Sequence, residues 1–252
     1  MNLNIYFMTS NPLKSMEEQV LFYFKNFRLF LPYMLLMWLP IVVTVIAALV
    51  VLYIQVEILL RGTLIGDLIV LILFLLSMII NYWTAIGLSL TIKKALDNNP
   101  DNKMKQNLSA GRRLFIPSLL TAILAGLIIF GGTILFIVPG VIFFIWYLFS
   151  FFIVVFENAK PLNALKQSKA LVVNHWLGIF LRWIMPMLIY SILIVLLRWI
   201  VAQIYNLISP DLVWWVVGKR LIDTPIYFLI FPLILMVPIM LYNEIKSTPK
   251  KI

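Results

Sequence analysis

The sequence predicts an all-α protein built as a polytopic bundle of six transmembrane helices. Hydrophobic residues make up 63% of the 252 positions and charged residues only 12%, whereas soluble domains average about 45–50% and about 25%. The apolar residues are gathered in long runs separated by short basic segments. Because lipid offers backbone groups no hydrogen-bond partner, runs of this kind must form helices. We therefore expect one integral membrane domain over residues 1–252.

Six apolar runs are long enough to be membrane spans. They cover residues 29–54, 64–92, 114–137, 141–156, 176–205 and 221–245. The connection between the third and fourth runs has two possible positions. The favoured turn is Val138-Pro139-Gly140, and the alternative is Gly131-Gly132 with Pro139 as a kink in a longer fourth helix. Both alternatives predict the same topology.

The distribution of positive charge predicts the orientation of the chain. With both termini in the cytoplasm, fifteen basic residues fall on the cytoplasmic side and three outside. Two more lie within the fifth span, which completes the 20 Lys and Arg residues. Cytoplasmic loops carry an excess of Lys and Arg, so this orientation is expected, and the net charge of +10 indicates topology rather than nucleic-acid binding. The residues expected to contact anionic lipid headgroups are Lys93, Lys94, Arg112, Arg113, Lys166 and Lys169.

Two amphipathic segments are expected to lie along the cytoplasmic surface of the membrane. In the first, residues 15–30, Ser15 and Glu18 fit a capping box. In the second, residues 161–173, Pro161 suits the first helical turn, and its lysines can reach phosphates. The face of the first segment expected to contact apolar surroundings consists of Val20, Phe24, Phe27 and Leu31.

Ionisable residues within spans are costly and are therefore candidates for function. Arg182 and Arg198 are separated by about 24 Å along a helix. That spacing favours two headgroup anchors that fix the depth of the fifth span, and the alternative is a substrate pathway. Glu157 ends the fourth span and is expected to stabilise the N-terminus of the helix that begins at Pro161, rather than to couple protons.

A weakly polar face runs along the second span. Ser77, Asn81, Ala85 and Ser89 recur every four residues and so share one side of the helix. Small polar residues allow close helix packing and hydrogen bonds across the contact. A packing seam is the favoured interpretation, and a polar pathway is the alternative.

No constellation for catalysis or metal binding is visible in the sequence. The chain has no cysteine and one histidine, His175, and its spans hold no paired acids. Thiol chemistry, Cys-based metal sites and paired-histidine metal sites are thereby excluded. We expect a protein that is not an enzyme and that needs no cofactor.

Several short motifs in the second half of the chain resemble those of one known family. Leu135–Val141 is similar to an L-x-x-I-P-G-I signature that contains Pro139 and Gly140, and Phe156-Glu157 ends the helix that follows it. Pro161–Ser168 is similar to P-x-x-A-L-K-x-S, Leu171–Trp176 to L-V-x-G-N-W, and Leu241–Lys246, with Tyr242, to L-Y-x-D-L-R. Asn174 stands where the pattern prefers Gly, but Asn also tolerates a left-handed turn.

Together these motifs resemble the membrane domain that precedes some bacterial glycerophosphodiester phosphodiesterases, and its stand-alone six-span relatives. The resemblance implies a shared architecture, structural roles for the motif residues, and a bacterial or archaeal cytoplasmic membrane. The phosphodiesterase activity of that family belongs to a separate soluble domain with paired histidines, so it is not implied for this chain.

The expected function is that of a scaffold or accessory subunit of a membrane complex. Its partners would be membrane lipids and either another membrane protein or further copies of this chain. The alternative is a transporter or channel for a small solute or a lipid, formed by one chain or by a homo-oligomer. A polar interior cavity that contains the spans' polar side chains would favour transport, whereas a closed apolar bundle would favour the scaffold.

Overall fold

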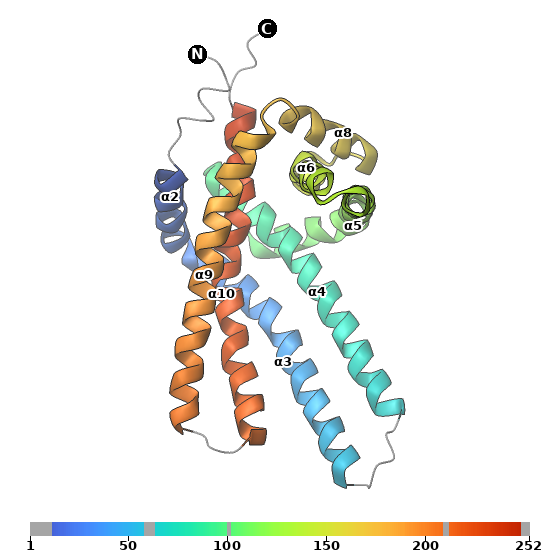
Figure 1. Ribbon diagram of the computed structural model, residues 1–252, viewed down its shortest axis with the longest axis vertical. Coiled ribbons are helices and arrows are strands. Elements are labelled where there is room, and N and C mark those ends of the chain that lie inside the picture. The colour runs from blue at the N-terminus through green and yellow to red at the C-terminus, as the bar shows by residue number, and fades with distance from the viewer. Residues whose placement is uncertain (1–11, 58–63, 100–101, 209–211, 248–252) are drawn as a thin grey trace.

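The computed structural model describes residues 12–57, 64–99, 102–208 and 212–247, and all regular structure within them is helical (Figure 1). The helices are α2 (Pro12–Lys25), α3 (Phe27–Glu57), α4 (Leu64–Leu96), α5 (Met104–Leu135), α6 (Ile137–Tyr147), α7 (Ser150–Glu157), α8 (Pro161–Val172), α9 (Trp176–Ile208) and α10 (Leu212–Ser247). In the described part of the chain, six helical stretches are long and apolar enough to cross a membrane, with α6 and α7 counted as one. The predicted all-α, polytopic membrane class is thus confirmed.

Two helices begin well before the predicted spans. Helix α5 begins at Met104 rather than near residue 114, and α10 begins at Leu212 rather than near residue 221. Hydropathy detects only the apolar part of a helix, whereas Lys, Gln and Arg also favour helix. The polar first turns of α5 are also held in place by packing, since Asn107 and Gly111 are buried there.

The turn between α5 and α6 lies at Phe136, whose backbone is extended (φ −160°, ψ 150°). Gly131 and Gly132 lie inside α5, which rules out the alternative turn, and Pro139 and Gly140 lie in the first turn of α6. A Cβ atom on Gly140 would lie 3.0 Å from the Cα of Thr133, so the two helices approach closely there. The predicted Pro139-Gly140 turn is therefore displaced by about one helical turn.

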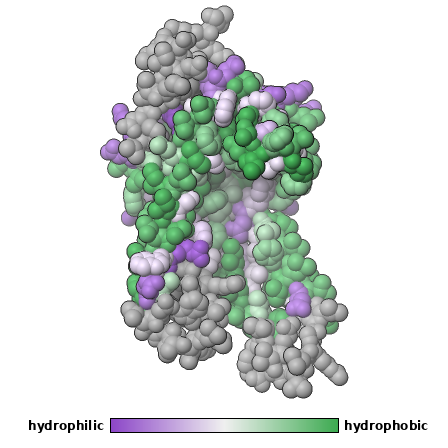
Figure 2. All heavy atoms as spheres, viewed as in Figure 1, coloured by the Kyte–Doolittle hydropathy of each residue, from purple (hydrophilic) through white to green (hydrophobic). Residues whose placement is uncertain are grey.

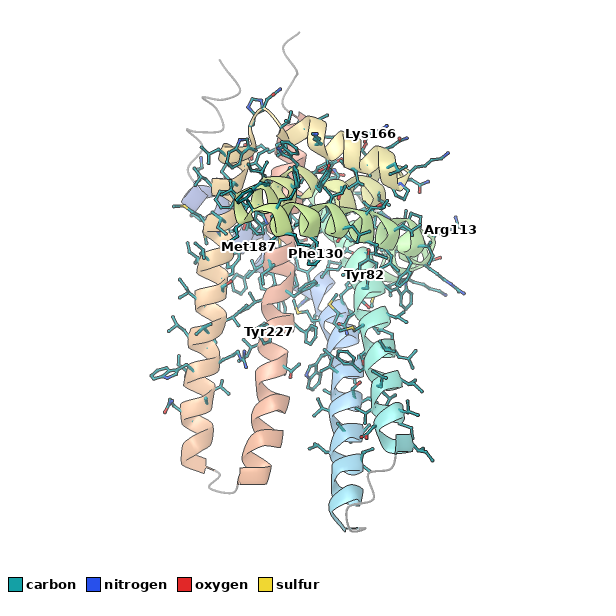
Figure 3. All side chains as sticks on the ribbon, turned by 45° about the vertical axis from the view of Figure 1, so that its right-hand side comes forward. Tyr82, Arg113, Phe130, Lys166, Met187 and Tyr227 are labelled. Atoms are coloured by element: carbon teal, nitrogen blue, oxygen red, sulfur yellow. The ribbon has the colours of Figure 1, made fainter. Side chains whose placement is uncertain are left out.

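Four long helices form two antiparallel pairs, α3 with α4 and α9 with α10 (Figure 1). The hairpin made by α5 and α6 does not run parallel to them. It is seen end-on in Figure 1 and runs across the long helices in Figure 3. We call it the crosswise hairpin. We call the end of the bundle that carries α8 the α8 end, and the end at which α3 and α9 finish the far end.

The buried core lies towards the α8 end. Phe30, Tyr33, Phe149, Ile179 and Met236 have no exposed surface and belong to one cluster. Outside this core the helices expose many apolar side chains, which cover much of the coloured surface in Figure 2. Exposed apolar residues on this scale require a membrane to cover them.

Helix α2 packs against α9 and α10 instead of lying free on a surface (Figure 1). The Tyr190 hydroxyl donates a hydrogen bond of 3.0 Å to Oε1 of Gln19, which is buried. The Tyr23 hydroxyl donates to the carbonyl oxygen of Leu229 at 2.8 Å. On the face expected to contact apolar surroundings, Phe24 is 69% exposed and packs on no other described helix, so its contact with lipid stays a prediction. Partner atoms on helices that are distant in sequence decide which face of α2 packs, and a local sequence pattern does not encode them.

We predict that Gly140→Ala lowers the free energy of unfolding by about 1–3 kcal/mol, because overpacking forces the backbones of α5 and α6 apart. The control is Gly126→Ala in α5, where an added Cβ meets no atom within 4 Å. The control should leave stability unchanged or slightly raised, because Ala favours helix. Thermal unfolding in mild detergent measures both, and equal effects of the two substitutions would contradict the close approach.

Candidate functional site

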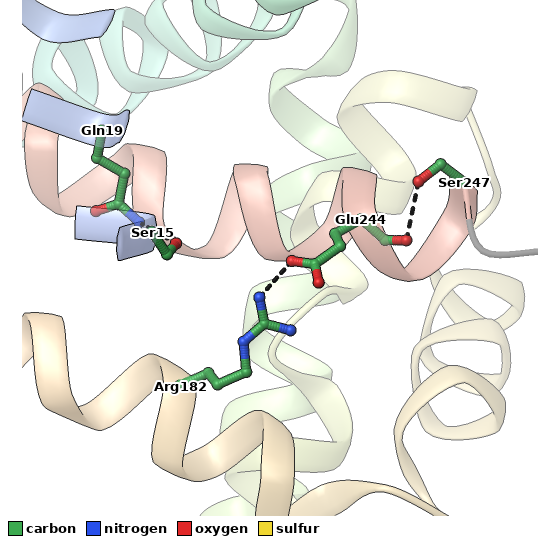
Figure 4. A network of polar contacts seen from close by, with 5 residues as sticks. All are labelled: Ser15, Gln19, Arg182, Glu244 and Ser247. Carbon is green, nitrogen blue, oxygen red and sulfur yellow. Dashed lines mark hydrogen bonds and ion pairs between the residues drawn. The ribbon is translucent and has the colours of Figure 1, made fainter. Parts of the chain in front are cut away.

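Arg182 lies inside the bundle rather than at lipid headgroups. It is 9% exposed, and its Nη2 donates a hydrogen bond to Oε2 of Glu244, which makes an ion pair between α9 and α10 (Figure 4). The predicted headgroup anchor is therefore wrong for this residue. A buried guanidinium needs a carboxylate within reach, and Glu244 supplies it from a helix that is distant in sequence.

Arg198 also links α9 to α10, closer to the far end. Its Nη1 donates to the hydroxyl of Tyr227, and its guanidinium carbon lies 5.1 Å from the centre of the Tyr227 ring. Figure 3 shows Tyr227 between these helices. The two arginines thus lie at different levels of one helix pair and do not form a common site.

The polar face of α4 packs partly against α3. The Ser77 hydroxyl is buried, 3.0 Å from the carbonyl oxygen of Pro40 and 2.8 Å from the hydroxyl of Thr44. Asn81 donates to the carbonyl of Ser77 in its own helix at 2.8 Å. Ser89 does the same to Ala85 at 2.8 Å and has no exposed surface. The Ser77 bonds join α4 to α3 as in a packing seam, whereas the bonds of Asn81 and Ser89 stay within α4.

Glu157 does not cap α8. It accepts hydrogen bonds from the Tyr242 hydroxyl and from Nζ of Lys246, and so connects the end of α7 to the end of α10. Lys160 precedes α8 without a side-chain capping bond, and Pro161 occupies the first turn as predicted. The ring of Tyr242 is buried beside Phe149 and Phe156, with centroids at 5.8 Å in both cases. Glu157 therefore joins the end of α7 to the end of α10.

Ser168 closes the break between α6 and α7. Its hydroxyl, on α8, donates to the carbonyl oxygen of Trp146 at 2.7 Å and accepts from the backbone N–H of Phe149 at 3.2 Å. Both groups lose their helical partners where the chain turns at residues 148–149. Unpaired backbone groups are costly in apolar surroundings, and Ser168, with no exposed surface, satisfies one donor and one acceptor.

A buried polar network joins α3, α4 and α5, and the sequence did not reveal it. The hydroxyl of Thr91 lies 2.6 Å from that of Tyr33 and accepts from Nδ2 of Asn107 at 2.8 Å. Asn102 donates to the carbonyl of Thr91 at 2.9 Å and accepts from Asn107 at the same distance. The two asparagines lie in a segment expected to be a loop. Their spacing of five residues gave no signal of burial.

A cavity of about 660 Å³ opens between α5 and α7. Its apolar wall contains Leu90, Leu114 and Phe156, and its polar wall contains Lys105, Gln106, Ser109, Arg113 and Asn158. The ammonium and guanidinium groups attract a phosphate, and the apolar wall suits acyl carbon. This combination fits an anionic phospholipid, and it is the candidate site.

Of the six basic residues predicted to contact headgroups, Arg113 alone lines this cavity. Lys166 is exposed on α8, Arg112 is exposed beside the cavity, and Nζ of Lys169 lies 4.5 Å above the ring of Trp146. Lys93 forms an ion pair with Asp97 at 2.8 Å, and Lys94 is half-buried. The structure thus separates these residues into three locations, the end of α4, the first turns of α5, and α8.

In the described residues no three His, Asp or Glu side chains gather as a metal site would require. Comparison of the chain with family models, curated proteins and solved structures finds no match. The resemblance stated above and the absence of enzymatic activity therefore stay predictions.

We predict that Ser168→Ala lowers the free energy of unfolding by about 1–3 kcal/mol, because it leaves two buried backbone groups without partners. Gln167→Ala, at the exposed neighbouring position, is the matched control and should change stability by less than about 0.5 kcal/mol. Thermal unfolding in detergent distinguishes them. A fall in the free energy of unfolding that is no larger for Ser168→Ala than for Gln167→Ala would refute the role of the hydroxyl.

Arg182→Met and Glu244→Gln should each destabilise the protein, and the double variant should lose less than the sum by about 1–3 kcal/mol, because the two residues interact directly. A double-mutant cycle of unfolding free energies measures this coupling. Additive losses would mean that the pair contributes nothing.

Proposed function

We propose that this membrane protein is a non-enzymatic scaffold or accessory subunit of a membrane complex, and that its α8 end binds anionic phospholipid headgroups. One observation carries the proposal. Three polar side chains of the long helices, those of Ser77, Arg182 and Arg198, make contacts within the bundle, between α3 and α4 and between α9 and α10. A solute pathway would instead need them to face a shared cavity.

The cavity between α5 and α7 supports the lipid-binding part of the proposal. It contains none of the pathway candidates Ser77, Asn81, Arg182 and Arg198, and its cationic groups come from the first turns of α5. Its composition suits a phosphate with attached acyl chains rather than a water-soluble ion. The proposed orientation places this site and α8 on the cytoplasmic side, which is supported by the gathering of lysines and arginines there.

The motif residues support the proposed kinship with the membrane domain of glycerophosphodiester phosphodiesterases. Gly140, Ser168 and Tyr242 each have a packing or hydrogen-bonding role that a substitution would disturb. Such roles are what an architectural family would require of its motif.

A lipid or solute transporter remains the second candidate, and one observation favours it. Figure 2 shows the visible face hollowed between the α9–α10 pair and the α3–α4 pair. A hollow of this kind suits the acyl chain of a transported lipid.

Affinity purification in mild detergent, followed by mass spectrometry of proteins and lipids, separates the two candidates. The scaffold proposal expects a membrane-protein partner in fixed stoichiometry. Recovery of a homo-oligomer that carries a specific solute, with no other protein, would overturn it in favour of transport.

We predict that Lys105→Ala with Arg113→Ala weakens the binding of anionic phospholipid by about tenfold or more, since each basic residue near a membrane surface contributes about 1 kcal/mol. Lys103→Ala with Arg112→Ala is the matched control, because both are exposed basic residues outside the cavity lining. Native mass spectrometry with anionic and zwitterionic lipids measures the difference. Equal weakening by both pairs would indicate only general attraction of charge.

A further inference from the structure

The crosswise hairpin is too apolar to lie in water. Phe130 is 65% exposed, Ile134 is 69% exposed, and Phe136 and Ile137 at its tip are each 75% exposed. No charged residue occurs between Arg113 and Glu157. Since soluble proteins rarely expose apolar surface of this extent, the hairpin must be surrounded by hydrocarbon or by another protein.

Its direction conflicts with that of the four long helices. The views in Figures 1 and 3 agree that the hairpin runs across α3, α4, α9 and α10. A bilayer has one normal, so helices that cross each other in this way do not all span it. Either the two helix pairs span the bilayer, or the hairpin does.

The level at which the hairpin crosses favours spanning by the two helix pairs. Helix α5 meets α4 at Tyr82, whose ring lies 5.3 Å from that of Phe115. From Leu64 to Tyr82 the helix is about 27 Å long. Helix α6 meets α9 where Phe144 lies 5.0 Å from Trp183. From Trp183 to Ile208 the helix is about 37 Å long. Between the hairpin and the far end, the long helices therefore have about the length of the ~30 Å hydrocarbon core.

The residues around the hairpin fit a membrane–water interface at this level. Helix α8 packs on α5 and α6, and its exposed Lys166 points away from the bundle (Figure 3). Arg112 and Arg113 stand at the base of the hairpin, where the apolar stretch begins. Lysines and arginines of this kind mark the depth of phosphates.

We propose that α3, α4, α9 and α10 span the membrane, whereas the crosswise hairpin lies in the membrane plane, inside the leaflet on the α8 side, with acyl chains around its tip. The hairpin widens the bundle within one leaflet without crossing the bilayer. Both termini remain on one side, because a pair of spans and an in-plane hairpin each return the chain to the side it left. The inference does not depend on the scaffold proposal.

Single-cysteine variants test the proposal, because the natural chain has no cysteine. Phe136→Cys places the probe at the hairpin tip. Ile65→Cys, 71% exposed near the far end, and Lys166→Cys on α8 mark the two sides. All three positions are exposed, so the core stays intact. The variants are reconstituted in phospholipid vesicles, treated with a membrane-impermeant maleimide, and spin-labelled for depth measurement by oxygen and nickel-chelate accessibility.

We expect Ile65→Cys and Lys166→Cys to react from opposite sides of the membrane. Phe136→Cys should not react from the side that labels Ile65→Cys, and its spin label should be accessible to oxygen at a depth within the leaflet on the α8 side. Labelling of Phe136→Cys together with Ile65→Cys would show that the hairpin spans and would overturn the proposal. Protection of the Phe136 label from both oxygen and nickel would show a protein neighbour, which would overturn the assignment of acyl chains as the surroundings.

Discussion

The hydrogen bonds of Ser168 are the interaction on which much of this arrangement depends. The chain leaves the crosswise hairpin at residues 148–149 and turns into α7, which carries the buried side chains of Phe152, Ile153 and Val154 into the core. A turn within an apolar region exposes backbone groups that no water can satisfy. Ser168, held on α8, supplies both missing partners. Helix α8 is thus required for the break in the helix beneath it.

The same constraint explains how the polar side chains are used. Hydroxyl, amide and charged groups within the helices bond to carbonyls or to each other across helix contacts, as Ser77 does with Pro40 and Arg182 with Glu244. Such bonds join α3 to α4 and α9 to α10, while Tyr23 and Gln19 attach α2 to the second pair. The exposed lysines and arginines of the described residues gather towards the α8 end, where the proposed orientation would place lipid headgroups.

Much of the fold was predictable, because helices that lie in a membrane must be apolar along their length and hydropathy measures that property. Apolar runs located six helical stretches, and Pro161 located the start of α8. The direction of the α5–α6 hairpin was not predictable, because length and composition are the same for a helix across a membrane and a helix within its plane. The partners of Arg182 and Glu157 were missed for a related reason. Both pair with α10 across large sequence separations, and no local pattern encodes such contacts.

The most direct test of this account measures helix orientation itself. Glycine-selective 15N labelling and solid-state NMR in oriented bilayers report the direction of each labelled N–H bond. Gly126, Gly131 and Gly132 lie in the crosswise part of α5, whereas Gly87 lies in α4 and Gly178 in α9. Variants with alanine at Gly126 and Gly131 assign the signals. The account predicts in-plane signals for the α5 glycines and transmembrane signals for Gly87 and Gly178. Transmembrane signals for all five would contradict it.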